Sequence, residues 1–133
     1  MNRPESFSLA LRAPEDIVRM RQNVREQATR LGFSLVDQTK IVTAASELAR
    51  NTMLHGGGGE VLVEPINERR KGLRLTFIDQ GPGIADIALA LQDGYTTGGG
   101  LGLGLGGARR LSNEFDIHTR PGEGTRVTIT RWG

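Results

Sequence analysis

Two pairs of short segments with alternating apolar residues constrain the fold of this chain more than any other feature. Residues 60–66 and 73–79 form the first pair, and residues 115–119 and 125–131 form the second, around Pro121–Gly124. Alternation over such lengths is typical of strands, and so short a connection joins two strands into an antiparallel hairpin. The chain is therefore predicted to build a sheet that is mostly antiparallel.

Helical patterns precede the first hairpin. Apolar residues recur at spacings of three and four between residues 15 and 31, which predicts an amphipathic helix that Gly32 ends. A second helix is predicted from residue 35 or 36 to about residue 55. The other predicted elements are a strand over 6–12, a helical turn near 84–91 and a short helix over 106–113. This order predicts an α/β two-layer sandwich, with a mostly antiparallel mixed sheet and helices on one face.

The composition excludes several classes of protein. A chain of 133 residues with 37% apolar and 24% charged residues suits one globular domain, which is read as 1–133. A nucleic-acid surface is disfavoured, because only 5% of residues are aromatic and no basic run is longer than Arg69–Lys71. The chain has no cysteine, no signal peptide and no membrane span, so we expect a cytoplasmic protein without disulfides or a membrane partner.

Eight of the 19 glycines fall between positions 94 and 107. Unhindered backbone amides ahead of a helix are how proteins hold anionic phosphates, although a loop that binds nothing has the same composition. The spacing Gly102-x-Gly104-x-x-Gly107 fits a dinucleotide fingerprint, but it follows a loop and too little chain remains for a doubly wound sheet. No Gly-Lys-Ser/Thr occurs, so a P-loop is excluded.

Glu47 and Asn51 lie four residues apart in the second predicted helix and so share one face. An Asn oxygen is a hard ligand that suits Mg²⁺, and a Glu one turn earlier can accept a proton from an attacking hydroxyl or water. Taken alone, the pair fits the solvated face of an amphipathic helix better. Because the glycine run and the Asp79 motif occur in the same chain, we favour a functional site for the pair instead.

Asp79 ends an apolar strand and is followed by Gly81-Pro-Gly83. A carboxylate only accepts hydrogen bonds, so it suits an exocyclic amine, and glycines let the backbone approach a flat ring closely. A routine turn after a strand explains the same residues. Thr125, at the start of the last strand, offers a hydroxyl either to a base or to solvent.

In this order the residues resemble the GHKL superfamily of ATPases and kinases, which includes gyrase, Hsp90, histidine kinases and MutL. The motifs that carry the resemblance are Glu47-x-x-x-Asn51 for its N box, Asp79-x-Gly81-x-Gly83 and Gly100–Gly104 for its two glycine boxes, and Gly124-Thr125 for its adenine-side threonine. The resemblance implies the Bergerat ATP-binding fold, with Asn51 on Mg²⁺, Asp79 on the adenine amine and the glycine run as an ATP lid. The ATP-binding residues it implies are Asp79, Gly81, Gly83, Gly98, Gly100, Leu101, Gly102, Leu103, Gly104 and Thr125.

Within the superfamily the chain resembles small bacterial serine kinases of the anti-sigma and stressosome systems, of the RsbT switch-kinase type. The minimal length and the stretch 100–117 carry this likeness. It implies STAS-domain scaffold proteins as substrates, and a PP2C-type phosphatase or a sigma-factor pathway protein as a further partner. Thr52 departs from the pattern, since many relatives have a small apolar residue there.

The sequence thus predicts an ATP- and Mg²⁺-dependent serine/threonine protein kinase, in which Glu47 orients or deprotonates the acceptor hydroxyl and Asn51 positions Mg²⁺. An alternative of a different class is an ATP-binding switch module that restrains a sigma factor or activates a phosphatase with little catalysis. The catalytic domain of a histidine kinase is disfavoured, because no helical hairpin with an acceptor His precedes the predicted domain. A nucleic-acid-binding module, with steep salt dependence, is a distant further alternative.

Overall fold

A computed structural model of the chain describes residues 6–91 and 104–133. Its elements follow the predicted order, and the boundaries differ from the predicted ones by a few residues. The phosphate-binding residues predicted at Gly98, Gly100, Leu101, Gly102 and Leu103 lie outside the described residues. The elements are β1 (Phe7–Leu11), α1 (Pro14–Arg30), α2 (Leu35–Leu54), β2 (Gly59–Asn67), β3 (Lys71–Asp79), α3 (Ile87–Ala90), α4 (Leu105–Arg110), β4 (Glu114–Thr119) and β5 (Thr125–Trp132).

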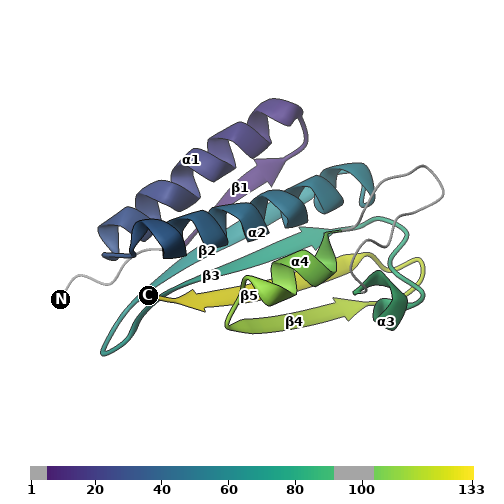
Figure 1. Ribbon diagram of the computed structural model, residues 1–133. Helices are drawn as coiled ribbons and strands as arrows, with labels where there is room; N and C mark the ends of the chain where they lie inside the picture. The colour runs from purple at the N-terminus through teal and green to yellow at the C-terminus, as the bar shows by residue number, and fades with distance from the viewer. Residues whose placement is uncertain (1–5, 92–103) are drawn as a thin grey trace.

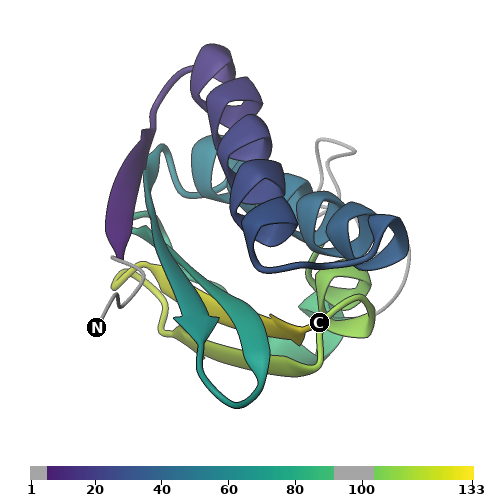
Figure 2. The ribbon, with the colours of Figure 1, turned by 90° about the vertical axis from the view of Figure 1, so that its left-hand side faces the viewer.

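The molecule has two layers, and α1, α2 and α4 cover one face of a five-stranded sheet (Figures 1 and 2). The strand order is β1-β2-β3-β5-β4, and every pairing among the described residues is antiparallel. The predicted α/β sandwich with helices on one face is confirmed. Within residues 6–91 and 104–133 the sheet has no parallel pair and so is not mixed, because the two hairpins join antiparallel through β3 and β5.

The strand register places two of the predicted site residues and a glycine side by side in one row at the end of the sheet. Asp79, the last residue of β3, pairs with Gly59 of β2 on one side and with Thr125 of β5 on the other. In Figure 1 this end lies beside the C-terminal end of α2 and beside α3. The sheet therefore brings the carboxylate and the threonine of the predicted base site together, although 45 residues separate them in the sequence.

Local chemistry fixes the ends of the two long helices. Pro14 occupies the first turn of α1, and the Asp16 carboxylate accepts from the backbone N–H of Arg12 (2.9 Å) and of Ala13 (3.1 Å). The hydroxyl of Ser34 caps α2 by accepting from the N–H of Asp37 at 3.1 Å. None of the described helices is long and apolar enough to cross a membrane.

The start of α2 is tied to the far end of the sheet by a partly buried ion pair. Arg131 of β5 donates through Nη2 to Asp37 Oδ1 at 2.7 Å and through Nη1 to the carbonyl of Leu111 at 2.8 Å. The hydrogen bond from Arg131 is the main reason that the pKa of Asp37 lies below its usual value. This contact keeps α2 from shifting along its own axis. The residues at the C-terminal end of α2 therefore have a fixed position over the sheet.

Candidate functional site

Asp79 is a buried carboxylate, with only 4% of the residue exposed. Its Oδ1 accepts from the backbone N–H of Gly81 at 2.9 Å. Burial raises the pKa of Asp79, while backbone hydrogen bonds from Gly81 and Thr125 and the nearby His55 act in the opposite direction. The Asp-Gln-Gly segment thus forms a local turn, as one interpretation of the sequence predicted. The same turn also holds a carboxylate that is buried away from solvent.

Glycines pack closely around Asp79 and leave no room for side chains. A Cβ at Gly56 would lie 2.5 Å from Asp79 Oδ2, and one at Gly124 would collide with the Asp79 carbonyl. Gly83 has a φ of +75°, and a Cβ there would collide with the carbonyl of Arg120. Backbone without side chains therefore borders the carboxylate at Gly56 and Gly124, and it is glycine backbone of this kind that can approach a flat ring closely.

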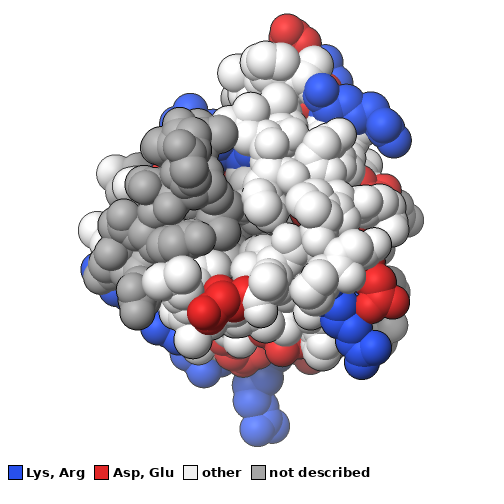
Figure 3. Space-filling view, turned by 90° about the vertical axis from the view of Figure 1, so that its right-hand side faces the viewer, with Lys and Arg blue, Asp and Glu red and all other residues white. Residues whose placement is uncertain are grey.

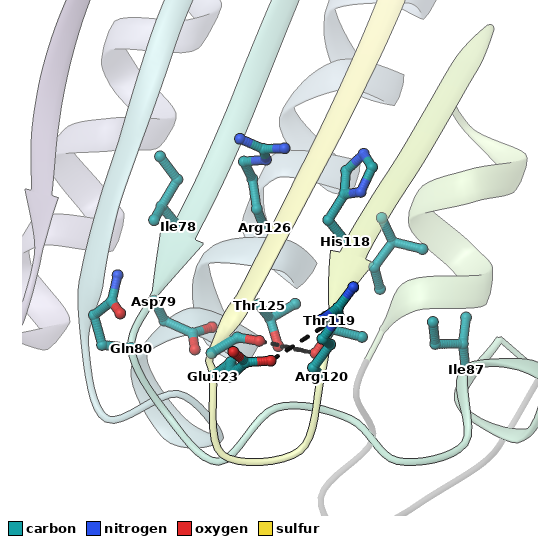
Figure 4. Close-up of a pocket in the computed structure, with 12 residues that line it drawn as sticks. Ile78, Asp79, Gln80, Ile87, His118, Thr119, Arg120, Glu123, Thr125 and Arg126 are labelled. Carbon is teal, nitrogen blue, oxygen red and sulfur yellow. Dashed lines mark hydrogen bonds and ion pairs between the residues drawn. The ribbon is translucent and has the colours of Figure 1, made fainter.

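The hydroxyls of Thr125 and Thr119 lie side by side at the base of Figure 4, with their Oγ1 atoms 2.9 Å apart. Thr119 Oγ1 is also 2.9 Å from the Gly124 carbonyl, to which it donates, and 2.9 Å from the N–H of Ile84, from which it accepts. One arrangement satisfies all three bonds: Thr125 donates to Thr119. The Thr125 oxygen then keeps its lone pairs, so Asp79 and Thr125 both present acceptors.

Asn51 is buried, with 5% exposure, and its side-chain oxygen Oδ1 has no hydrogen-bond partner among the described residues. Taken alone, the sequence pattern fitted a solvated helix face at this position; the burial of Asn51 does not fit that alternative. The neighbouring Thr52 is also buried, but its hydroxyl donates to the Leu48 carbonyl at 3.0 Å. A buried carbonyl oxygen without a donor costs stability and is unusual unless a ligand satisfies it.

Glu47 lies one turn before Asn51 on α2, and its side chain is 37% exposed. Its Oε1 is 3.1 Å from Nη1 of Arg50, as in many helix surface pairs. A Cβ added to Gly104 would lie 2.6 Å from Glu47 Oε2 and 2.8 Å from its Cβ. Gly104, within the glycine run, therefore packs directly on the Glu47 side chain, so these two predicted site residues are brought together.

His55 joins the two halves of the site. It is the C-cap of α2, as the sequence suggested, and its ring Nε2 lies 3.2 Å from the Gly83 carbonyl, to which it donates when that nitrogen carries a proton. Its backbone N–H bonds the Asn51 carbonyl at 2.9 Å. Because α2 carries Glu47 and Asn51 and ends against the Gly81–Gly83 turn, one helix links the predicted metal side and the predicted base side.

Two cavities border Asp79 on the face of the sheet away from the helices. One, of about 510 Å³, includes Thr125 and Arg126 in its lining, and the other, of about 600 Å³, includes Gly56 and Glu60. Neither is lined by Glu47 or Asn51, so the cavities do not bring the whole predicted site together. Figure 3 shows the end of the molecule beside α3, where charged side chains lie mostly at the edge and uncharged ones occupy the centre.

The site contains residues that the sequence analysis did not assign to it. Thr119 holds Thr125 through the strand register, and the pairing of 119 with 125 could have been found from the short Pro121–Gly124 turn that the sequence predicted. Gly56 carries no such signal, because it is one of four consecutive glycines and only its packing distinguishes it.

The buried carboxylate predicts how stability depends on pH. The folded pKa of Asp79 is raised above the ordinary value of 3.8 that holds in the unfolded chain, so the folded state binds more protons than the unfolded state between these two pKa values. The free energy of unfolding therefore falls as the pH rises from 3.8 through the folded pKa. Asp79→Asn does not titrate, so its stability relative to wild type should rise over that window and then level off.

Urea unfolding at a series of pH values measures this difference. Glu68→Gln, in the exposed turn between β2 and β3, controls for the loss of one negative charge. A difference between Asp79→Asn and wild type that stays constant from pH 3.5 to 7 would contradict the buried carboxylate.

Comparison with known proteins agrees with this geometry. The family model of histidine kinase-, DNA gyrase B- and HSP90-like ATPases matches residues 36–132. The serine/threonine-protein kinase RsbT of Bacillus subtilis is 48% identical over 118 residues, which are 88% of this chain and 89% of RsbT. An anti-sigma F factor of Thermoanaerobacter sp. (strain X514) is 30% identical over 110 residues, covering 79% of this chain and 77% of that protein.

Among solved structures, the RsbU and RsbW domains of a Mycobacterium tuberculosis protein align with a TM-score of 0.67 at 23% identity. The alignment covers 97% of this chain and 33% of that one, so this chain spans about a third of the solved protein, and the likeness concerns the fold. The family match implies that the chain binds ATP. The chain belongs to the histidine kinase-, DNA gyrase B- and HSP90-like ATPase family and, within it, groups with RsbT.

Proposed function

We propose that the chain transfers the γ-phosphoryl group of ATP to a serine or threonine of a STAS-domain regulatory protein, with Mg²⁺ as the metal. As a partner-switching kinase of stress or sigma-factor signalling, it then binds a PP2C-type phosphatase or another protein of the pathway. The similarity to RsbT, a serine/threonine-protein kinase, and to anti-sigma F factors supports this reading.

The observation that carries the proposal is the unsatisfied oxygen of Asn51, one helical turn from Glu47. A buried amide oxygen without a donor fits a hard cation, so Asn51 would hold Mg²⁺. When bound, Mg²⁺ supplies neutralisation of the phosphate charge during transfer. The unsatisfied oxygen of Asn51 adds nothing to the stability of the helix, whereas a metal ligand beside a carboxylate has a use in phosphoryl transfer.

The residues of the chain have separate tasks in this reaction. The acceptor oxygen forms a bond to the γ-phosphorus while the bond from that phosphorus to the β–γ bridging oxygen breaks, and ADP leaves. Glu47 accepts the proton of the acceptor hydroxyl. Asp79 and Thr125 hold the base, and the glycine-rich segment that ends at Gly104 binds the phosphates through backbone amides.

Asp79 and Thr125 should give a preference for ATP over GTP. Both present acceptors, which match the exocyclic amine of adenine, whereas guanine offers a carbonyl oxygen at that position. A hydrogen bond to a charged group contributes about 1.5–3 kcal/mol, which corresponds to a preference of about tenfold or more. Asp79→Asn should weaken ATP binding and reduce the difference in affinity between ATP and GTP. Thermal-shift titration with both nucleotides measures this difference. Equal stabilisation of wild type by ATP and GTP would contradict a role for Asp79 in recognising the base.

Incubation with γ-labelled ATP and purified STAS-domain proteins, followed by mapping of the labelled residue, tests the function. We expect label on one serine or threonine of one partner, and none with Asn51→Ala. The similarity to anti-sigma F factors favours a second candidate, a switch module that binds partners with little catalysis. Nucleotide-dependent binding of a partner without transfer of label would select that candidate.

A further inference from the structure

Gly56, the first residue after the C-cap of α2, lies against the side chain of Asp79. Gly56 is buried, and a Cβ there would lie 2.5 Å from Oδ2 and 2.6 Å from the Cβ of Asp79. These separations are shorter than any that real carbon atoms maintain, and the atoms in the way belong to a short side chain enclosed by backbone. Any side chain at Gly56 would therefore displace the carboxylate.

The other side of Gly56 is equally confined. A Cβ at Gly81 would lie 2.6 Å from the Cα of Gly56, and the N–H of Gly81 is the donor that holds Asp79 Oδ1. Gly56 is therefore enclosed between the carboxylate and the turn that orients it. Its φ is not in the left-handed region, so the position requires glycine for space and not for backbone conformation.

Gly56 is also held at a fixed distance from the rest of the site. Its N–H bonds the Asn51 carbonyl at 3.1 Å, and the preceding His55 reaches the Gly83 carbonyl at 3.2 Å. The backbone at Gly56 cannot move away from Asp79 without breaking the end of α2. The oxygen beside Gly56 is Oδ2, the one that Gly81 does not occupy.

We propose that Gly56 is a positioning residue for base recognition: its missing side chain lets the end of α2 pack directly against the Asp79 carboxylate and hold it in the orientation in which it accepts from the base. This inference rests on the proposed function, because it assigns Gly56 a part in the choice of nucleotide. A methyl group at this position would turn the carboxylate out of that orientation.

The test compares Gly56→Ala with Gly57→Ala, one residue along. Gly57 has a φ of +76° and nothing within 4 Å of its would-be Cβ, so alanine there strains the backbone without touching Asp79. Dissociation constants for ATP and GTP are measured by calorimetry with Mg²⁺ present. Gly56→Ala should bind ATP at least tenfold more weakly, with an ATP:GTP preference near one, whereas Gly57→Ala should lose stability and keep the preference.

The two proposals fail differently. If wild type binds neither nucleotide, the proposed function fails. If wild type prefers ATP and Gly56→Ala keeps that preference, the role of Gly56 is wrong while the kinase proposal stands. If Gly56→Ala does not fold, thermal unfolding of the double variant Gly56→Ala/Asp79→Gly decides, because removing the carboxylate makes space for the methyl group. A cooperative transition in the double variant supports the contact, and its absence overturns the inference.

Discussion

Glu47→Gln should lower the rate of phosphate transfer by about 10²–10⁴-fold while ATP binding stays nearly intact, because removal of a general base has an effect of that size. Glutamine keeps the length and shape of the side chain, so the contact with Gly104 remains. The variant loses the negative charge, and with it the ion pair to Arg50, as well as the ability to accept a proton at Oε1 or Oε2. Single-turnover transfer from labelled ATP gives the rate, and equilibrium titration gives the affinity.

Glu26→Gln is the matched control for this variant. Glu26 is also an exposed helix carboxylate in an ion pair, with Arg30 at 2.6 Å, but it lies on α1 and has no place in the proposed site. We expect its transfer rate to equal that of wild type. Full activity of Glu47→Gln would show that Glu47 is an ordinary solvated helix residue and not the general base. It would also favour the alternative function, a module that binds its partners without catalysis.

Asn51→Ala should abolish transfer and disturb the Mg²⁺ dependence of ATP binding, with the fold retained. The oxygen that the substitution removes has no partner among the described residues, so its loss breaks no hydrogen bond made by that atom. Alanine also has the higher helix propensity. The change in unfolding free energy should therefore be well below the 2–5 kcal/mol that is typical when a large buried side chain is cut to alanine.

Thr52→Ala provides the opposite control at the next position. Its hydroxyl is buried and bonded to Leu48, so the variant should lose stability, by about 0.5–1.5 kcal/mol for the bond, and keep its requirement for Mg²⁺. Titration of Mg²⁺ at fixed ATP, read as transfer and as nucleotide binding, separates the two variants. An unchanged magnesium requirement in Asn51→Ala would contradict the assignment of the metal ligand.

The sequence predicted the elements well, because their periodicity is a local property. Apolar spacing located α1 and α2, and the short turns identified both hairpins. The pairing of β3 with β5 was not predictable in the same way, since alternation reports which side chains share a face and not which strands become neighbours. The meeting of Asp79 with Thr125 depends on that pairing.

The residue types of the candidate site were predicted from the sequence, whereas the way these residues are packed was not. Glu47, Asn51 and Asp79 stood out because carboxylates and an amide at those places suggest chemistry, and their roles stay predictions. The burial of Asn51 depends on what covers α2, and the importance of Gly56 depends on a carboxylate 23 positions away. Both are non-local, so no pattern near either residue reports them.

The row formed by Gly59, Asp79 and Thr125 limits where the length of this chain can vary. One residue inserted within β3 would move Asp79 out of register and turn it to the opposite face of the sheet, because side chains alternate along a strand. The exposed turn at 68–70, at the far end of the same hairpin, carries no such constraint (Figure 1). Insertions and deletions among related chains should therefore gather at that turn, and a peptide tag placed there leaves the row intact.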